Sequence, residues 1–134
     1  MTNPTTPDEA AIRRLIEDWA RAVRARDIEA VLAHHSADVL MFDVPLPFES
    51  KGIDAYRETW GLFYSARAEP IAFDIQRMDV VAGADVAFAT ALLQCAEKGA
   101  DGSQVPLDFR LTVGLRKVNG QWIVMHEHHS VPAT

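Results

Sequence analysis

The sequence predicts a single α+β domain in which helices come first and a curved antiparallel sheet wraps around them. Apolar residues recur at helical spacing in residues 7–25 and again in residues 53–66. From residue 71 onward the period changes, and extended segments follow one another across short turns that contain glycine. Segregated helices followed by a meander of strands are typical of the α+β class. We expect the domain to span residues 7–132, after a disordered tail at residues 1–6.

The first helix is predicted to begin at Pro7, because Thr6 is a favourable N-cap and Glu9 completes a capping box. A second, short helix is expected after Asp27, which is another favourable N-cap. A third helix is predicted over residues 53–66 and ends before Pro70. The predicted inward stripes are Ile12, Leu15, Ile16, Trp19 and Val23 in the first helix and Ile53, Tyr56, Trp60 and Phe63 in the third.

The predicted strands cover residues 39–44, 71–81, 85–97, 105–118 and a last segment that starts near residue 121. Pro45 and Pro47 force an extended loop after the first of them. Residues 86–93 are almost wholly apolar, which indicates a strand that is buried on both faces or lies at an interface. Asn119-Gly120 is the strongest short-range signal for a two-residue hairpin turn.

The last strand begins apolar and ends with three histidines and a glutamate, which indicates a buried core that grades into a polar site. Side chains alternate between the two faces of a strand. One face therefore carries Trp122, Val124, His126, His128 and Ser130, and the other carries Ile123, Met125, Glu127 and His129. Alternation does not say which face lines the interior. Either His126 and His128 contribute to the site, or Glu127 and His129 do.

Several residues could carry chemistry. Asp43 lies among apolar residues, where desolvation favours a carboxyl group that exchanges protons, or it caps the turn before the prolines. A histidine such as His128 or His126, paired with Asp43, would form an acid/base pair. Arg110, with Thr112 on the same face, either binds an anionic substrate or pairs with a carboxylate.

The inward aromatic residues are mostly core, and a subset is expected to line a cavity. Those predicted to contact a ligand are Trp19, Phe42, Tyr56, Trp60 and Phe63. His34 and His35 end a surface helix and are expected to be solvated. No metal site is predicted, because no second ligand motif accompanies His126 and His128.

The net charge of −6 makes nucleic acid and anionic membrane surfaces poor partners. Cys95 is the single cysteine, and the first residues carry no apolar signal segment, so a cytoplasmic location is predicted. The apolar strand 86–93 and the face formed by Phe109, Leu111, Val113 and Leu115 exceed what one set of helices can cover. We therefore expect a homodimer that associates through the sheet.

Three segments resemble the nuclear transport factor 2-like superfamily and, within it, the SnoaL-like and ketosteroid-isomerase-like proteins. They are residues 19–32, residues 36–45 leading to Gly52, and residues 110–132 with their ending Trp122…His126-x-His128-x-Ser130-x-Pro132. The resemblance covers about residues 8–132. It implies a cone-shaped, cystatin-like fold with a conical cavity, a small-molecule ligand and no cofactor.

The resemblance also assigns positions in this chain. Asp43, two residues before Pro45, matches the general base of ketosteroid isomerases. Trp19 stands where those enzymes have a tyrosine oxyanion donor, and Thr112 stands where they have a protonated aspartate. The position of the base is kept and both strong acidic donors are replaced, which argues against steroid isomerisation.

Two functions follow from these observations. In the first, the protein is a cofactor-independent isomerase, dehydratase, cyclase or hydrolase that acts on a small apolar carbonyl compound. Asp43 and a histidine of the last strand would move the protons, and Arg110 or Trp19 would hold the oxygen. In the second, the protein is a ligand-binding or dimerising module of the same fold without turnover. Convergence of Asp43, Arg110 and His128 on open space would favour the enzyme.

Overall fold

The computed structural model describes residues 5–133 and confirms the α+β class. The prediction of a disordered tail falls mainly on residues 1–4, which lie outside the described residues. The elements, in chain order, are α1 (Pro7–Ala25), α2 (Ile28–Leu32), β1 (His35–Phe42), β2 (Ser50–Lys51), α3 (Ile53–Ser65), β3 (Phe73–Ala82), β4 (Val86–Lys98), β5 (Gln104–Val118) and β6 (Gln121–Ser130).

The helices begin where their capping residues predict. The Thr6 hydroxyl accepts a hydrogen bond from the backbone N–H of Glu9 at 3.1 Å, and the Asp27 carboxylate accepts one from Ala30 N–H at 3.2 Å. These caps satisfy backbone donors that have no partner inside the first turn of a helix. No helix within residues 5–133 is both long enough and apolar enough to cross a membrane.

The sheet has six strands in the order β2-β1-β6-β5-β4-β3. Strands β3 to β6 form the predicted antiparallel meander, with Asn119 and Gly120 at positive φ in the last turn. β1 pairs with β6 in parallel, which the sequence analysis did not foresee. β1 also begins at His35, four residues before the predicted start. The parallel pairing brings the end of β1, and with it the start of the following loop, beside the histidine-rich end of β6.

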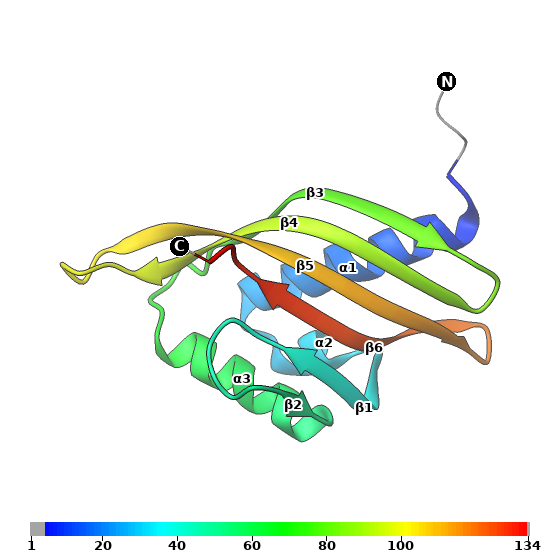
Figure 1. Cartoon of the computed structure of the whole chain (residues 1–134), viewed down its shortest axis with the longest axis horizontal. Helices are drawn as coiled ribbons and strands as arrows, with labels where there is room; N and C mark the ends of the chain where they lie inside the picture. Colours follow the sequence, from blue (N-terminus) through cyan, green and yellow to red (C-terminus); the bar gives the residue numbers. More distant parts are fainter. Residues whose placement is uncertain (1–4, 134) are drawn as a thin grey trace.

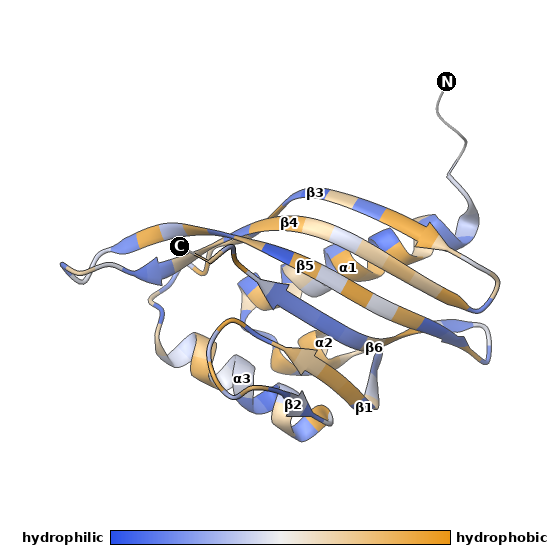
Figure 2. Ribbon diagram, in the orientation of Figure 1, coloured by the Kyte–Doolittle hydropathy of each residue, from blue (hydrophilic) through white to orange (hydrophobic). Residues whose placement is uncertain are grey.

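The sheet curves around the helices, so that α1 and α3 lie on its concave side (Figure 1). α1 packs against β3, and α3 packs against β1 and β2. The core lies between the concave face and these two helices; its most deeply buried large side chains include Tyr56, Phe73, Ile12, Ile16, Met41, Leu93 and Leu111. Figure 2 shows that this core gives way to hydrophilic residues along the second half of β6.

For β4 the sequence analysis left two alternatives, burial on both faces or a position at an interface, and the first is wrong for the single chain. Ala87, Ala89, Ala91 and Leu93 point into the core, whereas the alternate residues point outward. Val86, Phe88 and Leu92 are the large apolar residues on this outer face, and they are 59%, 48% and 40% exposed. One face of β4 is therefore covered by helices, and the other is open in the single chain.

A β-bulge in β6 determines which of its polar residues enter the core. Leu115 pairs with Val124 and Gly114 pairs with His126, so Met125 is an extra residue in β6. An extra residue reverses the face on which every later side chain lies. Trp122 and Val124 point inward before the bulge, and Glu127 and His129 point inward after it. Each of the two predicted faces of this strand is thus inward over half its length.

Candidate functional site

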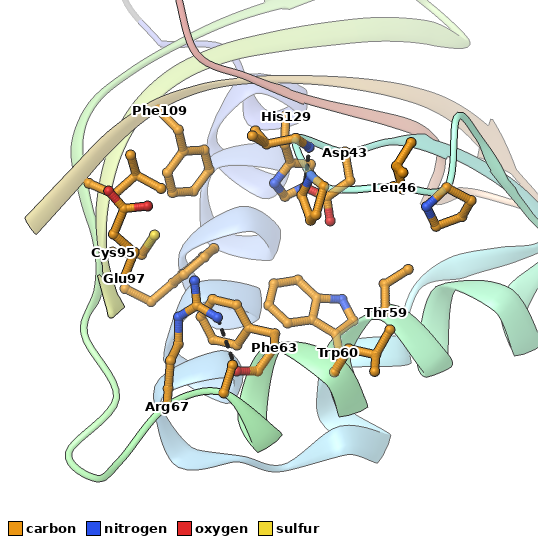
Figure 3. Close-up of a pocket in the computed structure, with 17 residues that line it drawn as sticks. Asp43, Leu46, Thr59, Trp60, Phe63, Arg67, Cys95, Glu97, Phe109 and His129 are labelled. Atoms are coloured by element: carbon orange, nitrogen blue, oxygen red, sulfur yellow. Dashed lines mark hydrogen bonds between the residues drawn. The ribbon is translucent and has the colours of Figure 1, made fainter. Parts of the chain in front are cut away.

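A pocket of about 400 Å³ opens between α3, the loop after β1 and the concave face of the sheet. Figure 3 shows it with its lining side chains. Apolar and aromatic groups form most of its wall, which is usual for a small-molecule site. The polar or ionisable side chains among its lining residues are Asp43, Thr59, Trp60, Arg67, Cys95, Glu97 and His129.

Glu127 lies directly behind the pocket and organises its polar end. The residue is 2% exposed, and its carboxylate accepts three hydrogen bonds. The donors are the Tyr56 hydroxyl at 2.7 Å and His35 Nε2 at 2.6 Å, both to Oε2, and His129 Nε2 at 2.9 Å to Oε1. Burial acts to raise the pKa of Glu127, but the bonds and charges of His129 and His35 outweigh it and lower the pKa to about 2. Glu127 is therefore ionised at neutral pH.

His35 is the cation that balances this buried carboxylate. Its Nε2 contacts Glu127, and its Nδ1 lies 3.0 Å from the carbonyl oxygen of Ala33. Both partners can only accept hydrogen bonds, so both ring nitrogens of His35 must carry protons. Burial lowers the pKa of His35, but the hydrogen bond and charge of Glu127 raise it further, so the net shift is upward. His35 and Glu127 thus form a buried ion pair.

His129 connects this ion pair to the pocket. Its Nε2 donates to Glu127, which leaves Nδ1 with no hydrogen-bond partner among residues 5–133. The ring lines the pocket and stacks on Phe109, with centroids 5.6 Å apart and planes 9° from parallel. Burial lowers the pKa of His129, whereas the bond to Glu127, the charge of Glu127 and the charge of Asp43 raise it, with a net upward shift. The arrangement is a carboxylate-oriented imidazole beside an apolar pocket.

Asp43, which the sequence analysis named as a candidate catalytic residue, lines the pocket. It follows the end of β1, where its Oδ1 accepts a hydrogen bond from the backbone N–H of Val44 at 2.7 Å. This bond is the turn-capping alternative of the sequence analysis, and it leaves Oδ2 uncommitted. Figure 3 shows Asp43 beside His129 at one end of the pocket, and the charge of Asp43 acts on the His129 ring.

The four predicted aromatic contacts from the helices divide into two layers. Trp60 and Phe63 line the pocket, whereas Trp19 and Tyr56 lie behind it. Trp19 Nε1–H donates to the Tyr56 hydroxyl at 2.9 Å, and that hydroxyl donates to Glu127. Burial, then Glu127, raises the pKa of Tyr56, so Tyr56 stays a neutral donor. Trp60 Nε1 forms no geometrically sound hydrogen bond with the described residues, although it lies close enough to the Tyr56 hydroxyl to affect that pKa.

Besides Trp19 and Tyr56, five further predicted site residues do not line the pocket: Phe42, Arg110, Thr112, His126 and His128. All five belong to the outer side of the sheet. The reason on β5 is alternation, because Phe109 and Leu111 occupy the inner face; the reason on β6 is the bulge at Met125.

Two of these outer residues have hydrogen-bond partners on their own side of the sheet. Arg110 donates to Ser130 at 3.1 Å, and His126 Nδ1 lies 2.7 Å from the carbonyl oxygen of Leu40. Thr112 is opposite His128 in the register, and the Phe42 ring contacts both histidines edge-on. Asp43, Arg110 and His128 therefore do not converge, and the predicted pairing of Asp43 with His128 is corrected to a neighbourhood of Asp43 and His129.

The sequence analysis was wrong about His35, whose side chain is 1% exposed rather than solvated. The cause is the early start of β1, which places His35 on the same inward face as Val39 and Met41. Ala37 between them is exposed and the pairing with β6 is irregular between His35 and Leu40, so no unbroken period of two in the sequence marked His35 as inward. Glu127 and His129 were named as the alternative face of the last strand, and the bulge could not be read from the pattern.

Within residues 5–133, no group of three histidine, cysteine, aspartate or glutamate side chains is arranged to hold a metal ion. The nitrogens of His35 and His129 contact the Glu127 carboxylate itself. The cluster is thus a hydrogen-bonded network. His129, whose Nδ1 has no partner among these residues, is the member that lines the pocket.

Comparison with known proteins agrees with this architecture. A nuclear transport factor 2-like protein of unknown function from Pseudomonas putida KT2440 is 38% identical, with a TM-score of 0.87, over 98% of this chain and 92% of that one. A ketosteroid isomerase-like protein from Erwinia carotovora atroseptica SCRI1043 is 23% identical, with a TM-score of 0.79, over 96% and 99%. The association domain of CaMKII from C. elegans is 16% identical, with a TM-score of 0.73, over 92% and 95%. The last two likenesses concern the fold.

No curated protein matches the chain. The SnoaL-like domain family, in contrast, matches residues 12–134, which is nearly the whole sequence. Together with the curved sheet, the helices on its concave side and the relative from Pseudomonas putida, this match shows that the chain belongs to the SnoaL-like family of the nuclear transport factor 2-like superfamily.

Proposed function

We propose that the protein binds a small, mainly apolar carbonyl compound in the pocket and catalyses proton transfer on it without a cofactor. The observation that carries this proposal is the His129–Glu127 pair in the wall of an otherwise apolar pocket. A histidine held by an ionised carboxylate, with its second nitrogen unpaired, is a recurrent general base. The fold shared with a ketosteroid isomerase-like protein supports the reaction class by analogy.

In the proposed reaction, His129 Nδ1 removes a proton from the carbon next to the substrate carbonyl. Glu127 accepts the Nε2–H bond throughout, so it fixes the tautomer and balances the imidazolium that forms. With a β,γ-unsaturated substrate, the same imidazolium then returns the proton to the γ-carbon of the resulting dienolate, which shifts the double bond and completes an isomerisation with no net change in charge. Asp43, beside His129, is the second group that can accept or return a proton. Glu127 acts through His129 and is a positioning residue.

Deuterium exchange at the α-carbon of a ketone tests the first of these steps. The probe is 1-phenylbutan-1-one in D₂O, followed by proton NMR, with the wild type and His129→Gln. We expect the wild type to accelerate exchange at C2 and the variant to lose a hundredfold or more of that acceleration. His34→Asn is the matched control, because His34 is exposed and its positive φ of 62° suits asparagine. Equal rates for wild type and buffer, or for wild type and His129→Gln, would contradict the proposal and favour a non-catalytic binding module.

We further propose that two copies associate through the outer face of the sheet. Val86, Phe88 and Leu92 give this face an apolar strip that the helices do not cover. The fold is shared with a domain named for association, the CaMKII domain of C. elegans, which supports the use of this architecture in assemblies. Self-association would remove the strip from water, and the pocket would stay open because it lies on the concave side.

A further inference from the structure

Arg67 presents a fixed positive charge to the pocket. The residue follows the C-terminal end of α3, and its side chain is held at three points. Nε donates to the carbonyl oxygen of Ala96 at 2.7 Å, Nη1 donates to that of Phe63 at 3.1 Å, and the guanidinium carbon lies 3.9 Å from the centre of the Phe63 ring. An arginine pinned in this way loses little further side-chain entropy when it binds a ligand.

The charge of Arg67 has no carboxylate partner among residues 5–133. The ion pairs in this part of the chain all involve other residues. No carboxylate oxygen lies within 4.0 Å of the Arg67 guanidinium nitrogens. Glu97 lines the same pocket but lies beyond that distance. The bonds to Ala96 and Phe63 use Nε–H and one of the two Nη1–H groups, so Nη2 and the second Nη1–H remain for a molecule in the pocket. The Cys95 thiol lies close enough to Arg67 for the guanidinium to act against the burial that raises the Cys95 pKa.

We infer that the natural ligand carries a carboxylate, which Arg67 binds at the end of the pocket opposite Asp43 and His129. This inference rests on the proposed function, because it names the class of that substrate: an apolar keto acid. Figure 3 shows Arg67 across the pocket from the His129 and Asp43 end, with apolar wall between the two. A carboxylate bound at Arg67 would therefore direct the hydrocarbon part and its carbonyl toward His129.

The charges in the pocket favour a carboxylate over a phosphate. One guanidinium neutralises one negative charge, and Glu97 places a second negative charge in the same wall. Because Glu97 already opposes the guanidinium charge, a singly charged anion meets less repulsion in this wall than a doubly charged phosphate does. The chain carries a net charge of −6, so its overall field repels anions. Any preference for an anion must then come from Arg67 itself.

Calorimetric titration with 4-oxo-4-phenylbutanoate and its methyl ester tests the inference, because the two probes differ in the charge and otherwise only by one methyl group. We expect the wild type to bind the acid about tenfold more tightly than the ester, which is typical of one charge-assisted contact in a partly desolvated site. Arg67→Gln should remove the preference for the acid over the ester. Arg67→Lys should retain part of it, and Glu97→Gln, the matched control, should increase the affinity for the acid.

Equal binding of acid and ester by the wild type, or binding of neither probe at millimolar concentration, would overturn the inference whatever the variants do. This comparison of acid with ester requires only the wild-type protein, so the test remains valid even if Arg67→Gln does not fold. Deuterium exchange on the two probes separates this inference from the proposed function. Equal binding of the two probes with rapid exchange would support the proposed proton transfer and reject a keto acid as the substrate class. An Arg67-dependent preference without exchange would keep the anion site and remove the catalysis.

Discussion

At the scale of single residues, Glu127 sets the protonation of both histidines that contact it. His35 must be a cation because its two ring nitrogens face acceptors, and His129 must carry its proton on Nε2 because that atom faces the same carboxylate. Tyr56 adds a third donor and passes a bond on to Trp19. Without these donors, the oxygen lone pairs of the buried Glu127 carboxylate would have no hydrogen-bond partner, which is costly away from water.

Replacing Glu127 by glutamine should be strongly destabilising. The substitution leaves His35 as a buried cation without its counter-ion, or forces it to lose a proton. We expect a loss of about 3 kcal/mol in the free energy of unfolding at pH 6, from urea titration, because breaking a buried ion pair typically costs that much. Glu97→Gln is the control, since Glu97 is exposed, and it should change stability by less than about 0.5 kcal/mol. A Glu127→Gln variant as stable as the control would show that the pair contributes nothing to folding.

The same cluster predicts how stability depends on pH. The pKa of Glu127 falls from an ordinary 4.5 to about 2 on folding, so its contribution is complete above pH 4.5 and is lost as the pH falls toward 2. The pKa values of His35 and His129 rise above 6.5, so their contribution is complete below pH 6.5 and is lost as the pH rises through the raised values.

We therefore expect the wild type to be most stable between about pH 4.5 and 6.5, from urea titrations at a series of pH values. Glu127→Gln should lack the decline on the alkaline side, because its histidines have no carboxylate to pair with. A wild-type stability that keeps increasing from pH 6 to pH 9 is the result that this account does not allow.

At the scale of elements, the bulge in β6 is the feature that creates the site. Before Met125, the inward residues are Trp122 and Val124, which pack in the core. After it, the inward residues are Glu127 and His129. Regular alternation would instead have turned His126 and His128 inward and placed Glu127 in solvent. One extra residue thus exchanges one set of polar side chains for the other.

Inserting one alanine between His126 and Glu127 tests this directly. The shift by one residue would place Glu127 and His129 on the outer face, and the ion pair with His35 would be lost. We expect the insertion to lower the free energy of unfolding by at least about 3 kcal/mol, the typical cost of breaking a buried ion pair.

The control is deletion of Met125, which removes the bulge but keeps Val124 opposite Leu115 and His126 opposite Gly114, so Glu127 stays inward and the cost should be smaller. An insertion variant that retains wild-type stability would show that the register does not fix the cluster.

At the scale of the whole molecule, the two faces of the sheet have separate roles. The concave face, together with α1 and α3, encloses the core and the pocket. The convex face carries the apolar strip of β4 and the polar residues Arg110, Thr112 and His128. The proposed association and the proposed ligand binding would therefore use separate surfaces.

The proposed homodimer gives a prediction at this scale. Phe88→Asp places a charge in the middle of the β4 strip, so it should convert the dimer to a monomer in sedimentation equilibrium at micromolar concentration. Phe48→Asp is the matched control, because Phe48 is 93% exposed but lies in the loop after β1 and should leave the assembly unchanged. A wild type that sediments as a monomer at this concentration would contradict the dimer.

The sequence by itself determined the fold class, the helix N-caps Thr6 and Asp27, and the Asn119-Gly120 turn. These features depend on local capping, turn chemistry and periodicity, which neighbouring residues along the chain settle among themselves. It also identified Asp43, Trp60 and Phe63, which line the pocket, because an apolar surrounding and a helical stripe are readable locally. It was wrong to leave the face formed by Phe109, Leu111, Val113 and Leu115 for a partner, because the helices cover it.

Only the tertiary structure decided which polar residues reach the interior. The parallel pairing of β1 with β6 brings His35 to Glu127 across 92 positions of the sequence, and no local pattern encodes such a contact. The bulge at Met125 is likewise a property of two paired strands, since its register is fixed only when β5 and β6 meet. Periodicity predicts that side chains alternate, but the face that is buried, and the point at which it changes, depend on what packs against the strand.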